Sequence, residues 1–266
     1  MTIRVLSVFF LLQTPFFLLS QGAIDGYMKA KKETDIALTY SYEHFDKYWF
    51  GSEIQDQSLT TQSASLFVAH GFRNDFNLIL SLPYMHIDDE NKNIQDAILA
   101  IKFRNKKTDF NSGSLNKITS VGFTFPASGY DVNTENPIGQ RAVAFMLRHL
   151  YQYENSGFFV HLQSGFDFRL IPETQFAVPI IFRTGYAHSK FYFDLWLDYF
   201  HTMEPGIDQS ISAGTGSQYL KIGGTFYYPV IKWLGVFVGG AQYLSGRNIG
   251  KASRVNVGVV LKRFGK

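Results

Sequence analysis

The sequence contains no cysteine, which excludes disulfides, thiolate metal sites and a lipid anchor on an N-terminal cysteine. Charged residues are also scarce, at 18% of the 266 residues, against about 25% in an ordinary soluble domain. The formal net charge is +3, and no run of lysine and arginine occurs. This balance argues against nucleic acid as a partner.

Recognisable catalytic and metal-binding motifs are missing as well. The chain has no nucleophile elbow and no P-loop, and its seven histidines do not show zinc-ligand spacing. We therefore expect no catalytic residues, no metal and no cofactor.

Beyond the first twenty or so residues, the chain lacks any run of 18 apolar residues, so it contains no second candidate for a transmembrane helix. Strands of a membrane barrel alternate between lipid and lumen, so their average hydropathy is close to neutral. The mean hydropathy of −0.06 is compatible with such a barrel.

The N-terminus has the pattern of a secretory signal peptide. Arg4 supplies the positive charge, an apolar stretch covers residues 5–19, and small or polar residues follow. Cleavage after Ser20 or after Gly22 would satisfy the small-residue rule. We predict a signal peptide at residues 1–22, with an uncleaved membrane anchor as the alternative.

Aromatic residues are abundant, with 26 Phe and 15 Tyr, and they recur in a period-two pattern along the chain. The clearest example is the apolar face Phe76, Leu78, Leu80, Leu82 and Tyr84, opposite Asn77 and Ser81. Similar alternation predicts about twelve strands of roughly ten residues, the length that a tilted transmembrane strand needs.

The connections between these strands alternate between short and long, as they do in outer-membrane barrels. We expect a periplasmic N-terminal segment at residues 23–34 and a barrel at residues 35–266, with both chain ends in the periplasm. One connection departs from the rule. Asn105 to Asn116 should be a short periplasmic turn but is long, so either the turn is extended or the strand register differs nearby.

The polar faces of these strands favour a barrel over a soluble β-sandwich. A sandwich places many Lys and Glu on its solvent face, whereas here the polar face is rich in Gly, Ala, Ser and Thr. Because unpaired sheet edges are costly in lipid, the sheet must close. The sequence thus predicts an all-β, transmembrane, antiparallel up-and-down barrel in the bacterial outer membrane. Eight scattered polar residues are candidates to line its lumen: Arg148, His161, Asp167, Arg169, Arg183, Asp194, Asp198 and Lys221.

Two pairs of these candidates invite an acid/base interpretation, namely His161 with Asp167 and Asp194 with Asp198. We favour a network of balanced lumen charges, since buried charges need partners. A hydrolase at the barrel rim would need a serine and histidine pair on the lipid side, and no convincing pair is present.

The predicted loop from Glu43 to Gln57 is rich in aromatic residues, and four of them are candidate ligand contacts: Phe45, Tyr48, Trp49 and Phe50. This cluster could form an entry site for a hydrophobic ligand, fold over the barrel mouth as a plug, or extend the aromatic girdle. The sequence leaves these three possibilities open.

Three segments resemble the meta-pathway phenol-degradation-like family of outer-membrane proteins. These are "VAHGFRNDFNLILSLPY" from Val68, "QDAILAIKFR" from Gln95 and "VGFTFPASGYD" from Val121. The sequence departs from the family pattern after Pro126, where Ala127-Ser128-Gly129 stands in place of Thr-Gly. The resemblance implies a barrel that takes up aromatic or other hydrophobic small molecules, and it transfers no functional residues.

The function expected from these observations is that of a channel or transporter for small molecules, with hydrophobic or aromatic molecules as the candidate cargo. The alternatives are a structural or adhesive barrel with a filled lumen, and a hydrolase sited at the rim. The expected partners are outer-membrane lipid, a small hydrophobic substrate and the barrel-assembly machinery during biogenesis.

Overall fold

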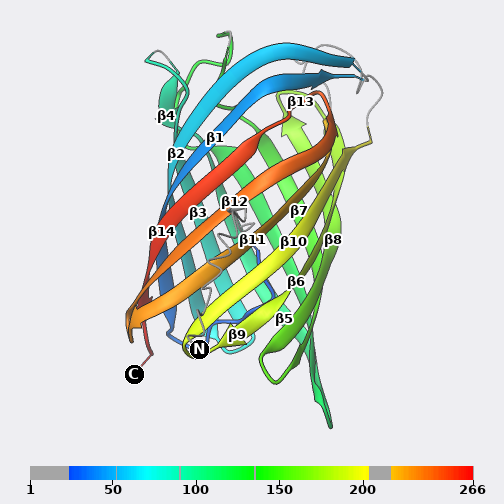
Figure 1. Ribbon diagram of the computed structural model, residues 1–266. Helices are drawn as coiled ribbons and strands as arrows, with labels where there is room; N and C mark the ends of the chain where they lie inside the picture. Colours follow the sequence, from blue (N-terminus) through cyan, green and yellow to red (C-terminus); the bar gives the residue numbers. More distant parts are fainter. Residues whose placement is uncertain (1–23, 52, 90, 135, 204–216, 266) are drawn as a thin grey trace, which may run out of the picture.

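The computed structural model describes residues 24–51, 53–89, 91–134, 136–203 and 217–265, so the predicted signal peptide lies outside the described residues. The described residues form one closed sheet (Figure 1). Twelve long strands make its wall: β1 (Thr34–Phe50), β2 (Glu53–Arg73), β3 (Phe76–His86), β5 (Asp96–Phe110), β6 (Gly113–Pro126), β7 (Val143–Asn155), β8 (Phe158–Ile171), β9 (Gln175–His188), β10 (Phe191–Thr202), β11 (Gln218–Ile231), β12 (Leu234–Arg247) and β14 (Ser253–Arg263). Two short strands, β4 (Lys92–Ile94) and β13 (Ile249–Gly250), pair with β3 and β1.

The barrel closes because β14 pairs with β1, with Ile36 opposite Leu261. Every long strand is antiparallel to both of its neighbours, and neighbours in sequence are neighbours in space. This confirms the predicted up-and-down barrel of about twelve strands. No helix among the described residues is long and apolar enough to cross a membrane.

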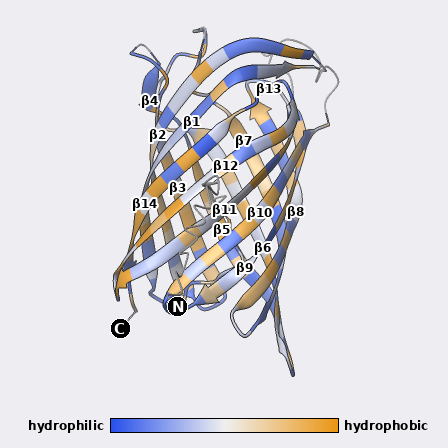
Figure 2. Cartoon of the chain, viewed as in Figure 1, coloured by the Kyte–Doolittle hydropathy of each residue, from blue (hydrophilic) through white to orange (hydrophobic). Residues whose placement is uncertain are grey.

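Hydrophilic and hydrophobic residues alternate along the strands (Figure 2), and side-chain burial in the barrel wall follows the predicted period of two. On β8 the outward Leu162 is 48% exposed, whereas the inward His161 is 1% exposed. On β6 the outward Phe123 is 51% exposed, whereas the inward Ser120 is fully buried. The exterior is thus an apolar belt suited to lipid, and the polar side chains lie inside.

The two ends of the barrel differ in the length of their connections. At the end where β1 starts and β14 ends, consecutive strands are joined by turns of two residues, for example between Arg73 and Phe76 and between Asn155 and Phe158 (Figure 1). The opposite end carries the longer connections. In outer-membrane barrels the short turns are periplasmic, so the end with the two-residue turns is the periplasmic end.

The long connection expected from Asn105 to Asn116 is a continuation of two strands. β5 runs to Phe110 and β6 starts at Gly113, while β3 pairs with β5 only as far as Phe103. The remainder projects beyond the periplasmic rim, and a register shift between Arg104 and Lys106 marks a β-bulge at its base. The turn is therefore extended, one of the two explanations that the sequence had left open.

The prediction of a loop from Glu43 to Gln57 is wrong, because these residues form a β-hairpin. β1 continues to Phe50 and β2 begins at Glu53, so the hairpin extends far past its neighbours at the extracellular end (Figure 1). Alternating aromatic side chains are as compatible with a strand as with a loop, and pairing with β2 and β13 decides the outcome.

Candidate functional site: the barrel lumen

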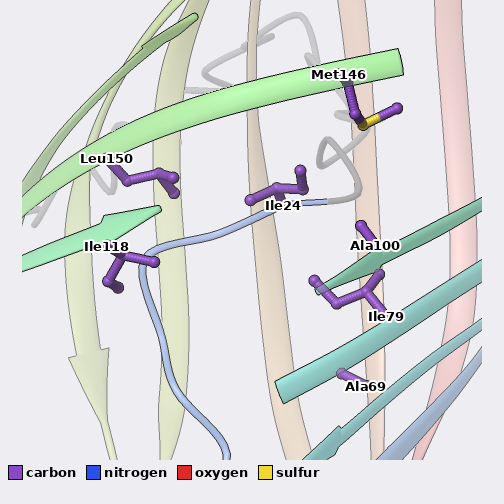
Figure 3. Close-up of a cluster of buried hydrophobic side chains, with 7 residues drawn as sticks. All are labelled: Ile24, Ala69, Ile79, Ala100, Ile118, Met146 and Leu150. Carbon is purple, nitrogen blue, oxygen red and sulfur yellow. The ribbon is translucent and has the colours of Figure 1, made fainter. Parts of the chain in front are cut away.

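The sequence had predicted a periplasmic segment at residues 23–34; in the structure residues 24–29 lie inside the barrel, and residues 30–32 are exposed beside the periplasmic β2–β3 turn, where the Lys31 N–H donates to Asn74. Ile24 packs in the lumen against buried side chains of β2, β3, β5, β6 and β7 (Figure 3): Ala69, Ile79, Ala100, Ile118, Met146 and Leu150. These apolar residues point inward, and the segment shields them from water. The segment enters the lumen because it covers this inward-facing apolar patch.

The segment is anchored by one buried lysine on β5. The Lys102 ammonium lies 2.7 Å from an Asp25 carboxylate oxygen, and it also donates to the backbone carbonyls of Asp25 and Tyr27 at 3.1 and 2.5 Å. Burial by itself would raise the pKa of the Asp25 carboxyl. The neighbouring ammonium groups of Lys102 and then Lys29 outweigh it and hold this pKa at about 2.

Further along, the segment joins the sheet through its backbone. The Lys29 N–H donates to the Asn77 side chain at 2.7 Å, and the Asn77 amide donates back to the Lys29 carbonyl at 3.0 Å. The Lys32 N–H then donates to the Gly71 carbonyl at 2.6 Å. A Cβ atom on Gly71 would lie 2.1 Å from the Ala30 carbonyl oxygen, so only glycine permits this approach. The segment thus follows the inner wall down to the start of β1.

One of the candidate lumen residues, His161, lies beside this segment together with Gln152. A Cβ atom on Gly26 would meet the Gln152 amide at 1.9 Å and the His161 ring at 2.9 Å. The Tyr27 ring packs edge-on against Phe159, with 5.6 Å between centroids. The segment therefore packs closely against β7 and β8 at this level.

Arg183 and Asp194 form a buried ion pair on adjacent strands near the same level. Their closest atoms are 3.5 Å apart, and both side chains are 3% exposed or less. The Tyr192 hydroxyl donates to Asp194 at 2.6 Å, and the Tyr192 ring lies 6.1 Å from Tyr27. Tyr192 thus connects this ion pair to Tyr27 of the N-terminal segment.

Arg148 and Asp167 form a second pair on β7 and β8. The Arg148 guanidinium donates to both carboxylate oxygens of Asp167, at 2.7 and 2.8 Å, and to the Phe166 carbonyl at 2.8 Å. Arg169 donates to the Gln140 side chain in the β6–β7 connection and to the Glu173 carbonyl. These arginines tie an inner wall and an extracellular connection together.

Asp198 and Lys221 form a third pair, 3.1 Å apart, in an aromatic surround. The Lys221 ammonium lies 5.1 to 5.5 Å from the ring centroids of Tyr219, Tyr243 and Trp196. A buried ammonium is stabilised by both the carboxylate and the aromatic faces. No group of three or more His, Asp or Glu able to hold a metal occurs among the described residues.

The candidates chosen from the sequence did not include four charged residues that form ion pairs inside the barrel, three on the wall and one in the N-terminal segment. These are Asp25, Lys102, Glu43 and Arg254, of which Arg254 and Glu43 lie 2.7 Å apart on β14 and β1. Arg254 and Lys102 alternate with outward apolar residues, so the period-two pattern marks both positions. Asp25 lies in a segment without periodicity, and nothing in the sequence links it to Lys102.

The four aromatic candidates are part of β1 and pack within the wall. Tyr48 is 5% exposed, and a Cβ atom on Gly250 would meet the Phe45 ring at 2.3 Å. The Lys251 ammonium lies 6.0 Å from the Trp49 ring centroid. Phe50 ends β1 opposite Glu53. The side chains of Tyr48, Phe45 and Trp49 thus pack on the β12–β14 side of the barrel mouth.

No family model and no curated protein matches the chain. Solved structures do match in fold. An outer membrane channel from Pseudomonas putida F1 has a TM-score of 0.72 at 12% identity, covering 92% of this chain and all of that one. The NanC porin has a TM-score of 0.58 at 7% identity over 85% and 98% of the two chains. The KdgM porin has a TM-score of 0.53 at 12% identity, covering 86% of this chain and 99% of that one.

At these identities the likeness establishes the fold alone. The chain therefore has the fold of a bacterial outer-membrane β-barrel, and the three structures named are channels and porins, not enzymes.

Proposed function

We propose that the protein is an outer-membrane channel for small molecules, held closed by residues 24–33. The observation that carries this proposal is the mode of attachment of the segment. It occupies the lumen through one buried lysine, one asparagine and a few backbone hydrogen bonds, and it is not a strand of the wall. A segment held in this way can leave the lumen while the barrel stays closed on itself.

We further propose that the cargo is apolar or aromatic, as the family resemblance implies. Support comes from the inner wall under the segment. Ile79, Ile118 and Leu150 are each 1% exposed with Ile24 in place, and departure of the segment would leave them facing the lumen. An apolar stretch of this kind favours contact with an apolar solute over bare hydration.

The test is solute flux into liposomes that contain the refolded protein. Phenol-sized aromatic solutes and sugars of similar size are compared, with empty liposomes as the reference. We expect faster aromatic flux through the protein, and a larger difference in a variant lacking residues 24–30. Equal flux of both solute classes would contradict the apolar cargo, and no protein-dependent flux in either form would contradict the channel.

The filled lumen also supports a second candidate, a structural barrel without transport. Four ion pairs between wall strands and the N-terminal segment occupy the interior of a twelve-strand barrel, which has limited room. Under this alternative, the variant without residues 24–30 would remain impermeable.

A further inference from the structure

Two lysines lie directly opposite each other on the periplasmic β5–β6 hairpin. Lys106 pairs with Lys117 in the register of these strands, and both side chains are exposed. Like charges at directly opposite positions of an antiparallel pair destabilise the sheet. The arrangement therefore calls for an anion that bridges them.

Both lysines point to the outside of the barrel. Lys117 pairs with Tyr151 on β7, and its ammonium lies 5.6 Å from the centroid of that ring. Tyr151 is 47% exposed, whereas its neighbour Gln152 is buried on the lumen side. Because paired residues share a face of the sheet, Lys106 and Lys117 lie on the outward face with Tyr151.

The acidic residues of the hairpin region cannot neutralise this pair. Asp109 lies on the opposite face and pairs with Lys107 at 3.0 Å. Glu154 also alternates to that face and accepts a hydrogen bond from Gln152 at 2.7 Å. Among the described residues, the outward face of β5 to β7 at this level thus carries positive charge alone.

The position of the pair along the barrel matches the lipid headgroup region. Through Tyr151, the lysines share one row of paired residues with Leu162 and Phe182, which are 48% and 42% exposed on the apolar belt. The hairpin itself extends past the periplasmic rim (Figure 1). This row of residues thus begins on the apolar belt at Phe182 and ends with Lys117 and Lys106 at the periplasmic edge of the belt.

A polar cluster separates the lysines from the apolar belt above them. The Thr119 hydroxyl donates to the Asn105 amide oxygen at 2.8 Å and lies 3.0 Å from the ring nitrogen Nδ1 of His149. His149 is exposed on the outward face. Such polar groups fit the boundary between acyl chains and headgroups, where hydrogen-bonding partners are present.

We propose that this outward face binds the headgroup phosphate of an anionic phospholipid in the periplasmic leaflet. Lys106 and Lys117 supply the charge, and Tyr151 and His149 flank the site. A zwitterionic headgroup brings its own ammonium next to the phosphate and would leave the lysine pair uncompensated. An anionic lipid such as phosphatidylglycerol or cardiolipin neutralises it. This inference is independent of what the lumen transports.

The test is native mass spectrometry of the full-length protein released from mixed micelles of phosphatidylglycerol and phosphatidylcholine. We expect phosphatidylglycerol adducts on the wild type and about a thirtyfold weaker preference in the double variant K106Q/K117Q, because each interfacial lysine contributes on the order of 1 kcal/mol and about 1.4 kcal/mol corresponds to a factor of ten. The matched control R104Q/K107Q removes two charges from the inward face of the same hairpin and should keep the preference. Heat-modifiable migration on gels verifies that each variant folds.

Three outcomes would overturn the proposal: no lipid preference in the wild type, an unchanged preference in the double variant, or an equal loss in the control. A further arm adds soluble glycerol phosphate. Displacement of the lipid at equimolar concentration would show a site for free phosphate and would contradict a membrane-lipid source.

Discussion

At the scale of single residues, the side chain that decides whether the lumen is filled is Lys102. Its side chain is only 4% exposed, and its ammonium donates to three oxygens of Asp25 and Tyr27. Hydrogen bonds to charged groups contribute about 1.5–3 kcal/mol each, so one side chain carries much of the attachment.

We predict that Lys102→Met opens the channel. Loss of these bonds should raise the open population about tenfold or more, since about 1.4 kcal/mol corresponds to a factor of ten. The measurement is open probability in planar bilayers. Lys107→Met is the control, because Lys107 is half-exposed and pairs only with the exposed Asp109. Equal open probability of the two variants would disprove the anchoring role of Lys102.

The depressed pKa of Asp25 predicts a pH response. The carboxylate has a pKa of about 2 in the folded protein, against an ordinary value of 3.8. Its contribution to holding the segment is therefore fully present above about pH 4 and is lost as the pH falls towards 2. We expect flat conductance from pH 7 to pH 4 and a rise below about pH 3. Asp25→Asn should already be open at pH 7 and lack this rise, and an unaltered pH profile in the variant would count against the account.

At the scale of strands and hairpins, the period-two pattern predicts the faces correctly but not the ends. Leu38, Leu99 and Phe123 lie outward as predicted, because alternation is a local property of the chain. Strand ends depend on partners far away in sequence. Phe45 is held by Gly250, and Asp25 contacts Lys102 across 77 positions. No periodic signal encodes such contacts, so the extended hairpins and the lumen segment could not be derived.

The extended part of β1 provides a test of this dependence. We predict that Gly250→Val detaches the end of β1 from β13, because a Cβ atom there would lie 2.3 Å from the Phe45 ring. Overpacking of this kind costs about 1–3 kcal/mol. Limited proteolysis should cut the β1–β2 hairpin near Glu53 faster than in the wild type, while the barrel remains intact. Gly129→Val, at an open position, serves as the control, and equal cleavage of both variants would refute the prediction.

At the scale of the whole molecule, two surfaces have opposite requirements. The exterior is an apolar belt that needs lipid, and the interior holds four ion pairs between wall strands and residues 24–29. The sequence predicted the belt and scattered inward charges, since both follow from alternation. It did not predict that residues 24–29 enter the lumen.

The belt predicts how the protein tolerates charge on its outside. Leu197→Arg should destabilise the folded barrel by about 2–4 kcal/mol if the residue faces the bilayer interior. Ile54→Arg, also on an exposed apolar residue but on the extracellular hairpin, should cost less than about 1 kcal/mol. Urea titration in lipid vesicles measures both. Similar costs for the two variants would place the membrane elsewhere on the barrel.

The most direct test of the central claim is a reversible cross-link between the segment and the wall. The chain has no cysteine, so Lys29→Cys with Asn77→Cys introduces a single pair at positions joined by two hydrogen bonds. We predict that planar bilayers show closed channels with the oxidised protein, and that adding a reductant to the same channels opens them. Equal conductance before and after reduction would contradict the claim that residues 24–33 close the channel.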